Sequence, residues 1–247
     1  MTTSNIVPVV WQLSVSHLTN NRTLFRGVLL NDSPFNYDKK IGTLKNLRKV
    51  LNSYLIKTYA NKDISIISNG NTLNTTTDNH GGFQIIGKFH HQGEIKIFTK
   101  NQNKPLKHLQ SYPIIFHETT GGFDVISDID DTIIVSYTAD FFKRISTLAF
   151  KSPHQRKVVE FTQKMFCEFK KLNARIYYVS KSESNLFGML TAYIEHNKLP
   201  KGELFLTPYL KLYQLLNPKK DIDFKTNNIR LLIRNTGNKN FVLFGDD

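Results

Sequence analysis

The sequence predicts a protein of the α/β class built from two parts. Residues 1–118 contain short apolar runs separated by turn residues, which favours a small, mainly antiparallel β-sandwich. Residues 119–247 contain strands alternating with helices, which favours βαβ units and a mostly parallel sheet. The 247 residues are 40% hydrophobic, so a sizeable core can be buried and wholesale disorder is excluded.

The first part is expected to hold five strands and one helix. Asn69-Gly70 favours a tight hairpin turn between two of the strands. The helix is predicted by leucine and valine at steps of three and four residues. The strands are expected at 24–29, 63–68, 73–77, 83–86 and 94–98, and the helix carries Leu44, Leu47, Val50, Leu51 and Leu55. A linker between the two parts is expected between Thr99 and Gly122.

The second part is expected to alternate four strands with three helices. Each strand is a short apolar run, and each helix has apolar residues at helical spacing. The strands are expected at 123–127, 174–179, 203–206 and 241–244, and the helices at about 154–172, 184–197 and 225–234.

Charge and cysteine content limit the classes of partner and location. Lys and Arg outnumber Asp and Glu by 33 to 20, a net charge of +13, which favours phosphate esters, nucleic acid or an acidic membrane surface. The single cysteine, Cys167, excludes an intramolecular disulfide framework and a cysteine-based zinc cluster. Because no secretory leader and no apolar run of about 20 residues are present, we expect a cytoplasmic protein without a transmembrane segment. A peripheral location at a membrane surface stays open.

Acidic residues follow two of the predicted strands. Asp128, Asp130 and Asp131 come after the first strand, where ligands gather in an open α/β sheet, and their mutual repulsion favours a bound cation or proton. The alternative is a helix N-terminus, which acidic residues also stabilise. Asp246 and Asp247 follow the last strand, where a simple turn is the alternative.

Two other polar residues occupy comparable places. Ser180 lies at the end of the second parallel strand, and Lys225 lies at the start of the last helix. Alone, each has an ordinary explanation, as a helix cap and as a solvated surface charge. The ordered set of four is difficult to obtain by chance.

These four motifs resemble those of the haloacid-dehalogenase-like phosphohydrolases. They are Asp128-Ile-Asp-Asp-Thr132, Ser180, Lys225 and Gly245-Asp246-Asp247. Longer stretches resemble the actin-patch-associated phosphatidate phosphatase catalytic domain: Val125-Ile-Ser-Asp-Ile-Asp-Asp-Thr-Ile133, Tyr178-Val-Ser-x-Ser-x-x-Asn-Leu186, Leu199-Pro-x-Gly202 and Phe241-Val-Leu-Phe-Gly-Asp246. The resemblance covers roughly residues 120 to 247 and implies a Rossmann-like catalytic domain at residues 119–247, preceded by an accessory β domain at 1–118.

The resemblance implies a role for each matched residue. Asp128 is the expected nucleophile, Asp130 the general acid and then base, and Thr132 orients their loop. Ser180, Ser182 and Lys225 are expected to bind the phosphoryl group. Mg²⁺ is the expected cofactor, held by Asp128, the backbone carbonyl of Asp130, Asp246 and Asp247, because hard cations prefer oxygen ligands.

The spacing of the motifs bears on the substrate. Neither the 52 residues from Asp128 to Ser180 nor the 45 from Ser180 to Lys225 leave room for a large cap domain, so we expect an open site suited to a head group at a surface. The leading hypothesis is a Mg²⁺-dependent phosphatase acting on phosphatidate or a related lipid phosphate. The alternatives are the same chemistry on a nucleic-acid end or a phosphoprotein, and a non-catalytic binding module. The oligomeric state is open.

Two further expectations concern a basic segment and the C-terminal end of the sequence. Basic residues after the nucleophile loop could face an anionic bilayer, although a solvated face explains them as well; they are Lys143, Arg144, Lys151, Arg156 and Lys157. The chain stops at Asp247, whereas relatives continue with an acidic loop, a helix and usually another strand. We therefore expect either a truncated sequence or a sheet that lacks its edge.

Overall fold

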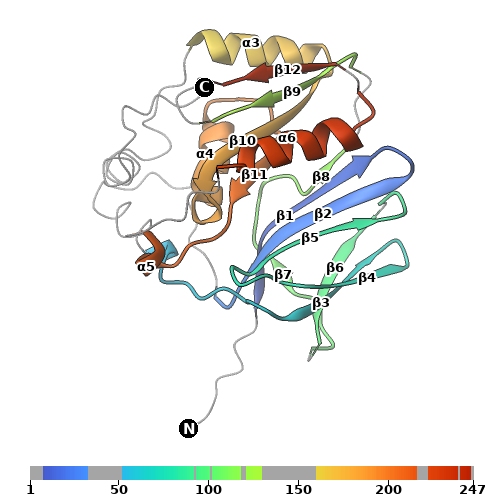
Figure 1. The fold of residues 1–247 in the computed structure, drawn as a ribbon, viewed down its shortest axis with the longest axis vertical. Helices are drawn as coiled ribbons and strands as arrows, with labels where there is room; N and C mark the ends of the chain where they lie inside the picture. The colour runs from blue at the N-terminus through green and yellow to red at the C-terminus, as the bar shows by residue number, and fades with distance from the viewer. Residues whose placement is uncertain are drawn as a thin grey trace.

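The computed structural model describes eight ranges of the chain, which build three sheets (Figure 1). The described ranges are 8–32, 52–91, 93–100, 102–117, 121–129, 160–215, 222–238 and 240–245. The helix predicted around Leu44 and the basic residues from Lys143 to Lys157 lie largely or wholly outside these ranges.

The first part of the chain forms two sheets packed face to face. Sheet A has the order β5-β2-β1-β7, with β8 also on β1, and sheet B has the order β4-β3-β6. The strands of sheet A are β1 (Val9–Leu18), β2 (Arg22–Leu30), β5 (Gly82–Gly87), β7 (Lys107–His108) and β8 (Ile115–Phe116). Those of sheet B are β3 (Asp63–Ser68), β4 (Asn71–Thr76) and β6 (Ile95–Thr99).

Apolar side chains from both sheets fill the space between them. Leu13, Val15 and Phe25 of sheet A meet Ile64 and Ile97 of sheet B in one buried cluster. All pairings are antiparallel except those of β7 and β8 with β1. The mainly antiparallel sandwich is therefore confirmed.

The turn between β3 and β4 has the conformation that its sequence predicts. Asn69 and Gly70 both have positive φ, +49° and +73°. Two consecutive residues of positive φ are the signature of a type I′ hairpin turn, whose twist matches that of the strands.

Two features of sheet A were not predicted. β1 lies before residue 24, where the first predicted strand starts, and it is buried along its whole length. Its serines face the second part of the chain, and this polar content hid the strand. The linker expected between Thr99 and Gly122 is also wrong in part, because this segment supplies β7 and β8.

The second part forms a parallel four-stranded sheet, sheet C, in the order β11-β10-β9-β12. Its strands are β9 (Asp124–Ser127), β10 (Arg175–Glu183), β11 (Glu203–Thr207) and β12 (Phe241–Phe244). The helical elements are α3 (Glu160–Lys171), the 3₁₀ turn η2 (Ser184–Leu186), α4 (Phe187–His196), α5 (Leu212–Leu215) and α6 (Phe224–Asn235). The predicted α/β class is confirmed.

Alternating side chains divide sheet C into two buried faces. Val125, Ile176 and Tyr178 pack in one cluster with Phe166 of α3 and Leu190 of α4. Ile126, Tyr177, Val179 and Phe205 pack on the opposite face with Phe224 and Leu232 of α6. Helices thus cover both faces, as Figure 1 shows.

The strand order reverses at β9. The chain runs from β9 outward through β10 to β11 and then returns to place β12 on the other side of β9. Open α/β sheets bind ligands at the carboxyl ends of the two strands between which the order reverses. In sheet C these strands are β9 and β12, so a ligand is expected at their carboxyl ends.

Sheet A also packs against the second part of the chain. The Trp11 indole N–H donates to the Ser184 carbonyl at 2.9 Å, and the Tyr112 hydroxyl donates to the Gly202 carbonyl at 2.8 Å. Trp11 and Tyr112 both contact the ring of Phe187 edge-on. We keep the division at residue 118 as a proposal, with sheet A as the layer shared between the two halves.

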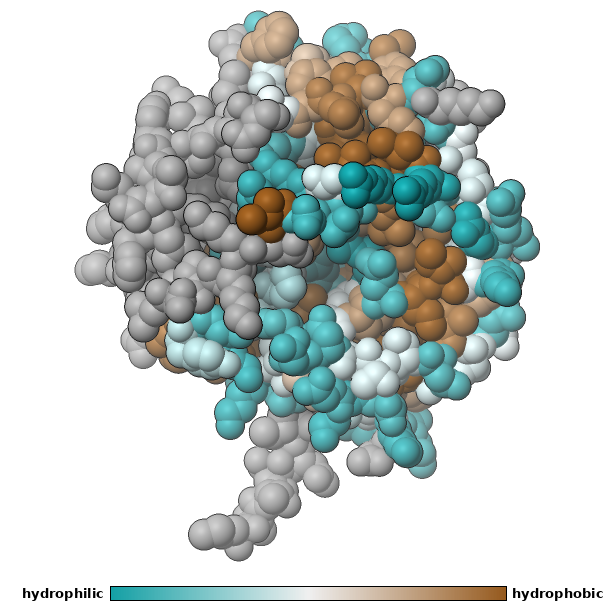
Figure 2. Space-filling model, in the orientation of Figure 1, coloured by the Kyte–Doolittle hydropathy of each residue, from teal (hydrophilic) through white to brown (hydrophobic). Residues whose placement is uncertain are grey.

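The far edge of sheet C is less well covered. The side chains of β12 are half-buried or exposed, and Leu243 is 59% exposed. Figure 2 shows hydrophobic surface over this strand.

Candidate active site

Asp128 lies directly beyond β9, at the switch point of sheet C. Its backbone N–H donates to the Phe244 carbonyl at 2.8 Å, which ties the end of β9 to the end of β12. The residue is buried, with 7% of its surface exposed. The sequence therefore places a carboxylate at the switch point of the sheet, where the ligand of an open α/β sheet is expected.

Donors among the described residues hold the Asp128 carboxylate. Oδ1 accepts a hydrogen bond from the Ile129 backbone N–H at 2.7 Å, and Oδ2 accepts one from the Lys225 ammonium at 2.5 Å. Hydrogen bonds to an ionised group are among the strong ones, and they favour its charged form. A carboxylate that is ionised and fixed in direction is suited to act as a nucleophile.

Lys225 reaches this carboxylate from the first turn of α6. A cation there opposes the helix dipole, so the local sequence does not favour it. The neighbouring Phe224 is buried against β10 and β11, which anchors the start of the helix on sheet C. The Lys225 side chain remains 23% exposed, so its ammonium lies at the boundary of protein and solvent.

Ser180 and Ser182 lie near the carboxyl end of β10. Tyr178 pairs with Ser127 of β9, so Ser180 comes two residues beyond the level at which β9 ends. The register between β10 and β11 shifts after Val179, and the Ser182 backbone N–H donates to the Ser180 hydroxyl oxygen at 2.9 Å. Both serines are buried, at 0% and 1% exposure.

The structure thus describes four of the predicted site residues. Asp128, Ser180, Ser182 and Lys225 all lie at the carboxyl edge of sheet C, and contact between Asp128 and Lys225 is direct. Asp130, Thr132, Asp246 and Asp247 lie outside the described ranges, so their roles stay predictions.

The metal prediction can be tested against the described residues only in part. Within those ranges no group of three His, Cys, Asp or Glu side chains could hold a metal ion. Asp128 is the one predicted side-chain ligand among them, and the other three predicted ligand residues are not described. Mg²⁺ prefers oxygen ligands such as the Asp128 carboxylate. The hydrogen bond from Asp128 to Phe244 brings the end of β12, which precedes Asp246, close to Asp128. The described residues of the predicted metal site therefore fit the ion.

Sequence reasoning missed the groups that hold Asp128 in place. These are the backbone N–H of Ile129, the carbonyl of Phe244 and the buried ring of Phe224. Backbone donors and acceptors carry no signal in the sequence. The apolar residue just before the lysine is the one signal that could have been interpreted as an anchor.

The fold and this site define a class of protein. An open parallel sheet with an aspartate at its switch point, bonded to a lysine from a later helix, has the layout of the haloacid-dehalogenase-like phosphohydrolases. Residues 123–247 match the family model for "Phosphatidate phosphatase APP1, catalytic domain". The chain belongs to this family of phosphoric monoester hydrolases, and the resemblance seen in the sequence is confirmed.

One curated relative aligns with about half of the chain. The chain is 24% identical over 128 residues to "Uncharacterized protein C29B5.04c" of Schizosaccharomyces pombe. The match covers 51% of this chain and 21% of the relative, so the chain spans about a fifth of the length of that protein.

Proposed function

We propose that the chain hydrolyses phosphatidate or a related lipid phosphomonoester with Mg²⁺, through an aspartyl-phosphate at Asp128. The observation that carries this proposal is the contact of 2.5 Å between Lys225 Nζ and Asp128 Oδ2 at the switch point of sheet C. Two residues 97 positions apart meet there. Membership of the phosphatidate phosphatase family supports the class of reaction.

The proposed reaction has two steps. A carboxylate oxygen of Asp128 attacks phosphorus, the bond to the leaving alkoxide breaks, and Asp130 protonates the alkoxide. Asp130 then takes a proton from water, whose oxygen attacks phosphorus and breaks the bond to Asp128, releasing inorganic phosphate and restoring the carboxylate.

Charge stabilisation falls to the groups around the transferring phosphoryl. Lys225 balances its negative charge, and the hydroxyls of Ser180 and Ser182 are the proposed donors to its oxygens. We assign Mg²⁺ to Asp128, the Asp130 carbonyl, Asp246 and Asp247. When bound, the ion supplies positive charge opposite the phosphate.

A lipid substrate is supported by family and by charge. The net charge of +13 favours an anionic surface, and the motif spacing leaves no room for a large cap. No helix within the described ranges is long and apolar enough to cross a bilayer. We propose a cytoplasmic protein that meets its substrate at a membrane surface.

The test is phosphate release from three kinds of phosphomonoester. Phosphatidate in vesicles, a DNA with a 5′-phosphate and a phosphopeptide are compared, each with Mg²⁺ and with a chelator. Asp128→Asn should abolish release because the amide is not a nucleophile. The matched control is Asp124→Asn, the same change four residues earlier at the start of β9, where the new amide oxygen can still accept from Asn238 Nδ2.

The outcomes separate the hypotheses. Release from phosphatidate alone, lost in Asp128→Asn and kept in Asp124→Asn, supports the proposal. Faster release from DNA or the phosphopeptide would move the substrate to that class. Release that is unchanged in Asp128→Asn would remove Asp128 from the nucleophile role.

A further inference from the structure

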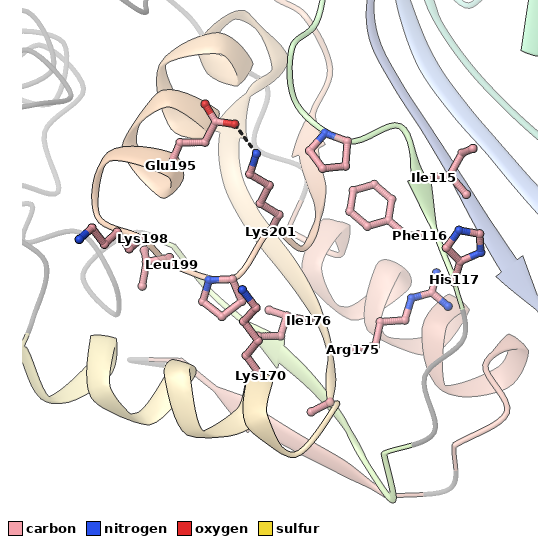
Figure 3. A pocket seen from close by; sticks show the side chains of 13 residues that line it. Ile115, Phe116, His117, Lys170, Arg175, Ile176, Glu195, Lys198, Leu199 and Lys201 are labelled. Atoms are coloured by element: carbon pink, nitrogen blue, oxygen red, sulfur yellow. Dashed lines mark hydrogen bonds and ion pairs between the residues drawn. The ribbon is translucent and has the colours of Figure 1, made fainter. Parts of the chain in front are cut away.

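A cavity of about 730 Å³ lies at the other end of sheet C, next to β8 (Figure 3). Ile115, Phe116 and His117 line it from β8 and the residue that follows. The second part of the chain contributes the end of α3, the start of β10 and the loop between α4 and β11. This volume lies within the range of small-molecule sites.

The cavity is distinct from the candidate active site. Arg175 in its lining is the first residue of β10, and Ser180 lies five residues later. A strand rises about 3.3 Å per residue, so the two ends are roughly 16 Å apart along β10. The cavity therefore lies at the amino edge of the sheet, opposite the carboxyl edge where Asp128 lies.

Positive charge dominates the lining. The lining holds four cations, Lys170, Arg175, Lys198 and Lys201, and one carboxylate, Glu195, which leaves a net charge of +3 among the described lining residues. Glu195 is already engaged by Lys201 at 2.6 Å, the pair drawn as a dashed line in Figure 3. These cations come from three separate elements, so they are not the solvated face of a single helix.

Arg175 gives the cavity a buried cation. Its side chain is 5% exposed, Nη1 donates to the His17 carbonyl at 3.1 Å, and Nη2 lies 3.9 Å from the carboxylate of Glu203. Within the described ranges Nε has no acceptor. A charge in a region of low dielectric acts more strongly than one in water.

The remaining lining is apolar. Ile115 and Phe116 lie on the β8 side, and Ile176 and Leu199 lie on the side of sheet C. In Figure 3 the ring of Phe116 lies between the lysines and the β8 backbone. The cavity thus combines an apolar wall with a basic one.

We propose that this cavity binds an amphiphilic anion, a phosphate or carboxylate head group joined to an apolar group. The head group lies against Lys170, Arg175 and Lys201, and the apolar group lies on Ile115 and Phe116. Because residues from both halves of the chain make the site, it requires sheet A to be docked on sheet C.

The test is calorimetric titration of the Asp128→Asn chain, which cannot turn the probe over. The probes are lysophosphatidate below its micelle concentration, a monoacylglycerol with the same tail, and inorganic phosphate. Each is repeated with Lys170→Gln and Lys201→Gln together. The matched control carries Lys104→Gln and Lys107→Gln, two exposed lysines that do not line the cavity.

We expect lysophosphatidate to bind at two sites per chain, of which one weakens at least tenfold in the Lys170 and Lys201 variant and neither weakens in the control. If no site weakens in the Lys170 and Lys201 variant beyond the control, the proposal is overturned. A single site that does weaken in that variant supports the proposal and counts instead against lipid binding at the candidate active site, because the second expected site rests on the proposed function. Equal binding of the monoacylglycerol would show that charge does not select the ligand. Equally tight binding of inorganic phosphate would show that the apolar wall does not select the ligand. Either of these two results would also overturn the proposal.

Discussion

Glu203 offers the sharpest test of how the two halves of the chain are joined. This residue begins β11 and is fully buried. Its carboxylate accepts hydrogen bonds from the hydroxyls of Ser14, at 2.8 Å, and Ser16, both on β1. We predict that Glu203→Gln destabilises the fold strongly, because it removes the negative charge at this junction.

The size of this destabilisation follows from the cations near the Glu203 carboxylate. Arg175 Nη2 lies 3.9 Å from Glu203 Oε2, both side chains at most 5% exposed, and at an effective dielectric of about 20 this attraction is about 4 kcal/mol. Burial lowers the pKa of Arg26 to about 10, and the charge of Glu203 opposes this shift. Breaking a buried pair by removing one partner costs about 3–5 kcal/mol.

Urea unfolding measures the change. Glu203→Gln should lower the free energy of unfolding by about 3–5 kcal/mol. The control Glu168→Gln removes the same charge from an exposed pair with Lys171, where the two side chains are 62% and 71% exposed, and should have no measurable effect. A loss in Glu203→Gln no larger than in the control would refute the reasoning.

Three other predictions concern the site, the packing and pH. Lys225→Ala should lower kcat by about 100- to 1000-fold, the usual loss when one charge-stabilising donor is removed. The control Arg230→Ala, on the exposed face of the same helix, should leave kcat unchanged. Equal kcat values for Lys225→Ala and the parent would show that Lys225 is an ordinary surface charge. Gly202→Ala should lower the free energy of unfolding by about 1–3 kcal/mol, because its Cβ would lie 2.4 Å from the Ile176 carbonyl oxygen. The control Gly122→Ala, where a Cβ meets open space, should leave it unchanged. A larger loss in Gly122→Ala than in Gly202→Ala would be inconsistent with the packing. The free energy of unfolding should fall as the pH drops through about 6.5 and level off below the folded pKa values, because the unfolded chain binds protons at its histidines more readily than the folded chain does. A urea midpoint that stays constant from pH 8 to 5 would contradict this. Burial lowers the pKa of the three histidines responsible, His17, His91 and His108.

Much of the fold could be predicted from periodicity. The strands and helices of sheet C and the Asn69-Gly70 hairpin follow from local patterns, and the structure confirms them. β1 was not predicted as a strand, because its serines face the Glu203 carboxylate and not solvent. A polar residue buried against a partner far along the chain looks the same in the sequence as an exposed one.

The site shows a similar division. Motif order placed Asp128 and Lys225 as functional residues, and their contact is observed. Sequence reasoning did not find that Phe224 anchors the lysine, or that Arg175 and three lysines line a cavity at the other end of sheet C. These depend on tertiary contacts between elements that are distant in the chain.

The central claim is that Asp128 carries the phosphoryl group during turnover. The direct measurement is to quench the reaction with phosphatidate in acid, reduce the acyl phosphate with borohydride, and identify the modified residue by peptide mass spectrometry. The account predicts homoserine at position 128, with Mg²⁺ required for its formation. Turnover with an unmodified Asp128, or reduction at another carboxylate, would contradict it.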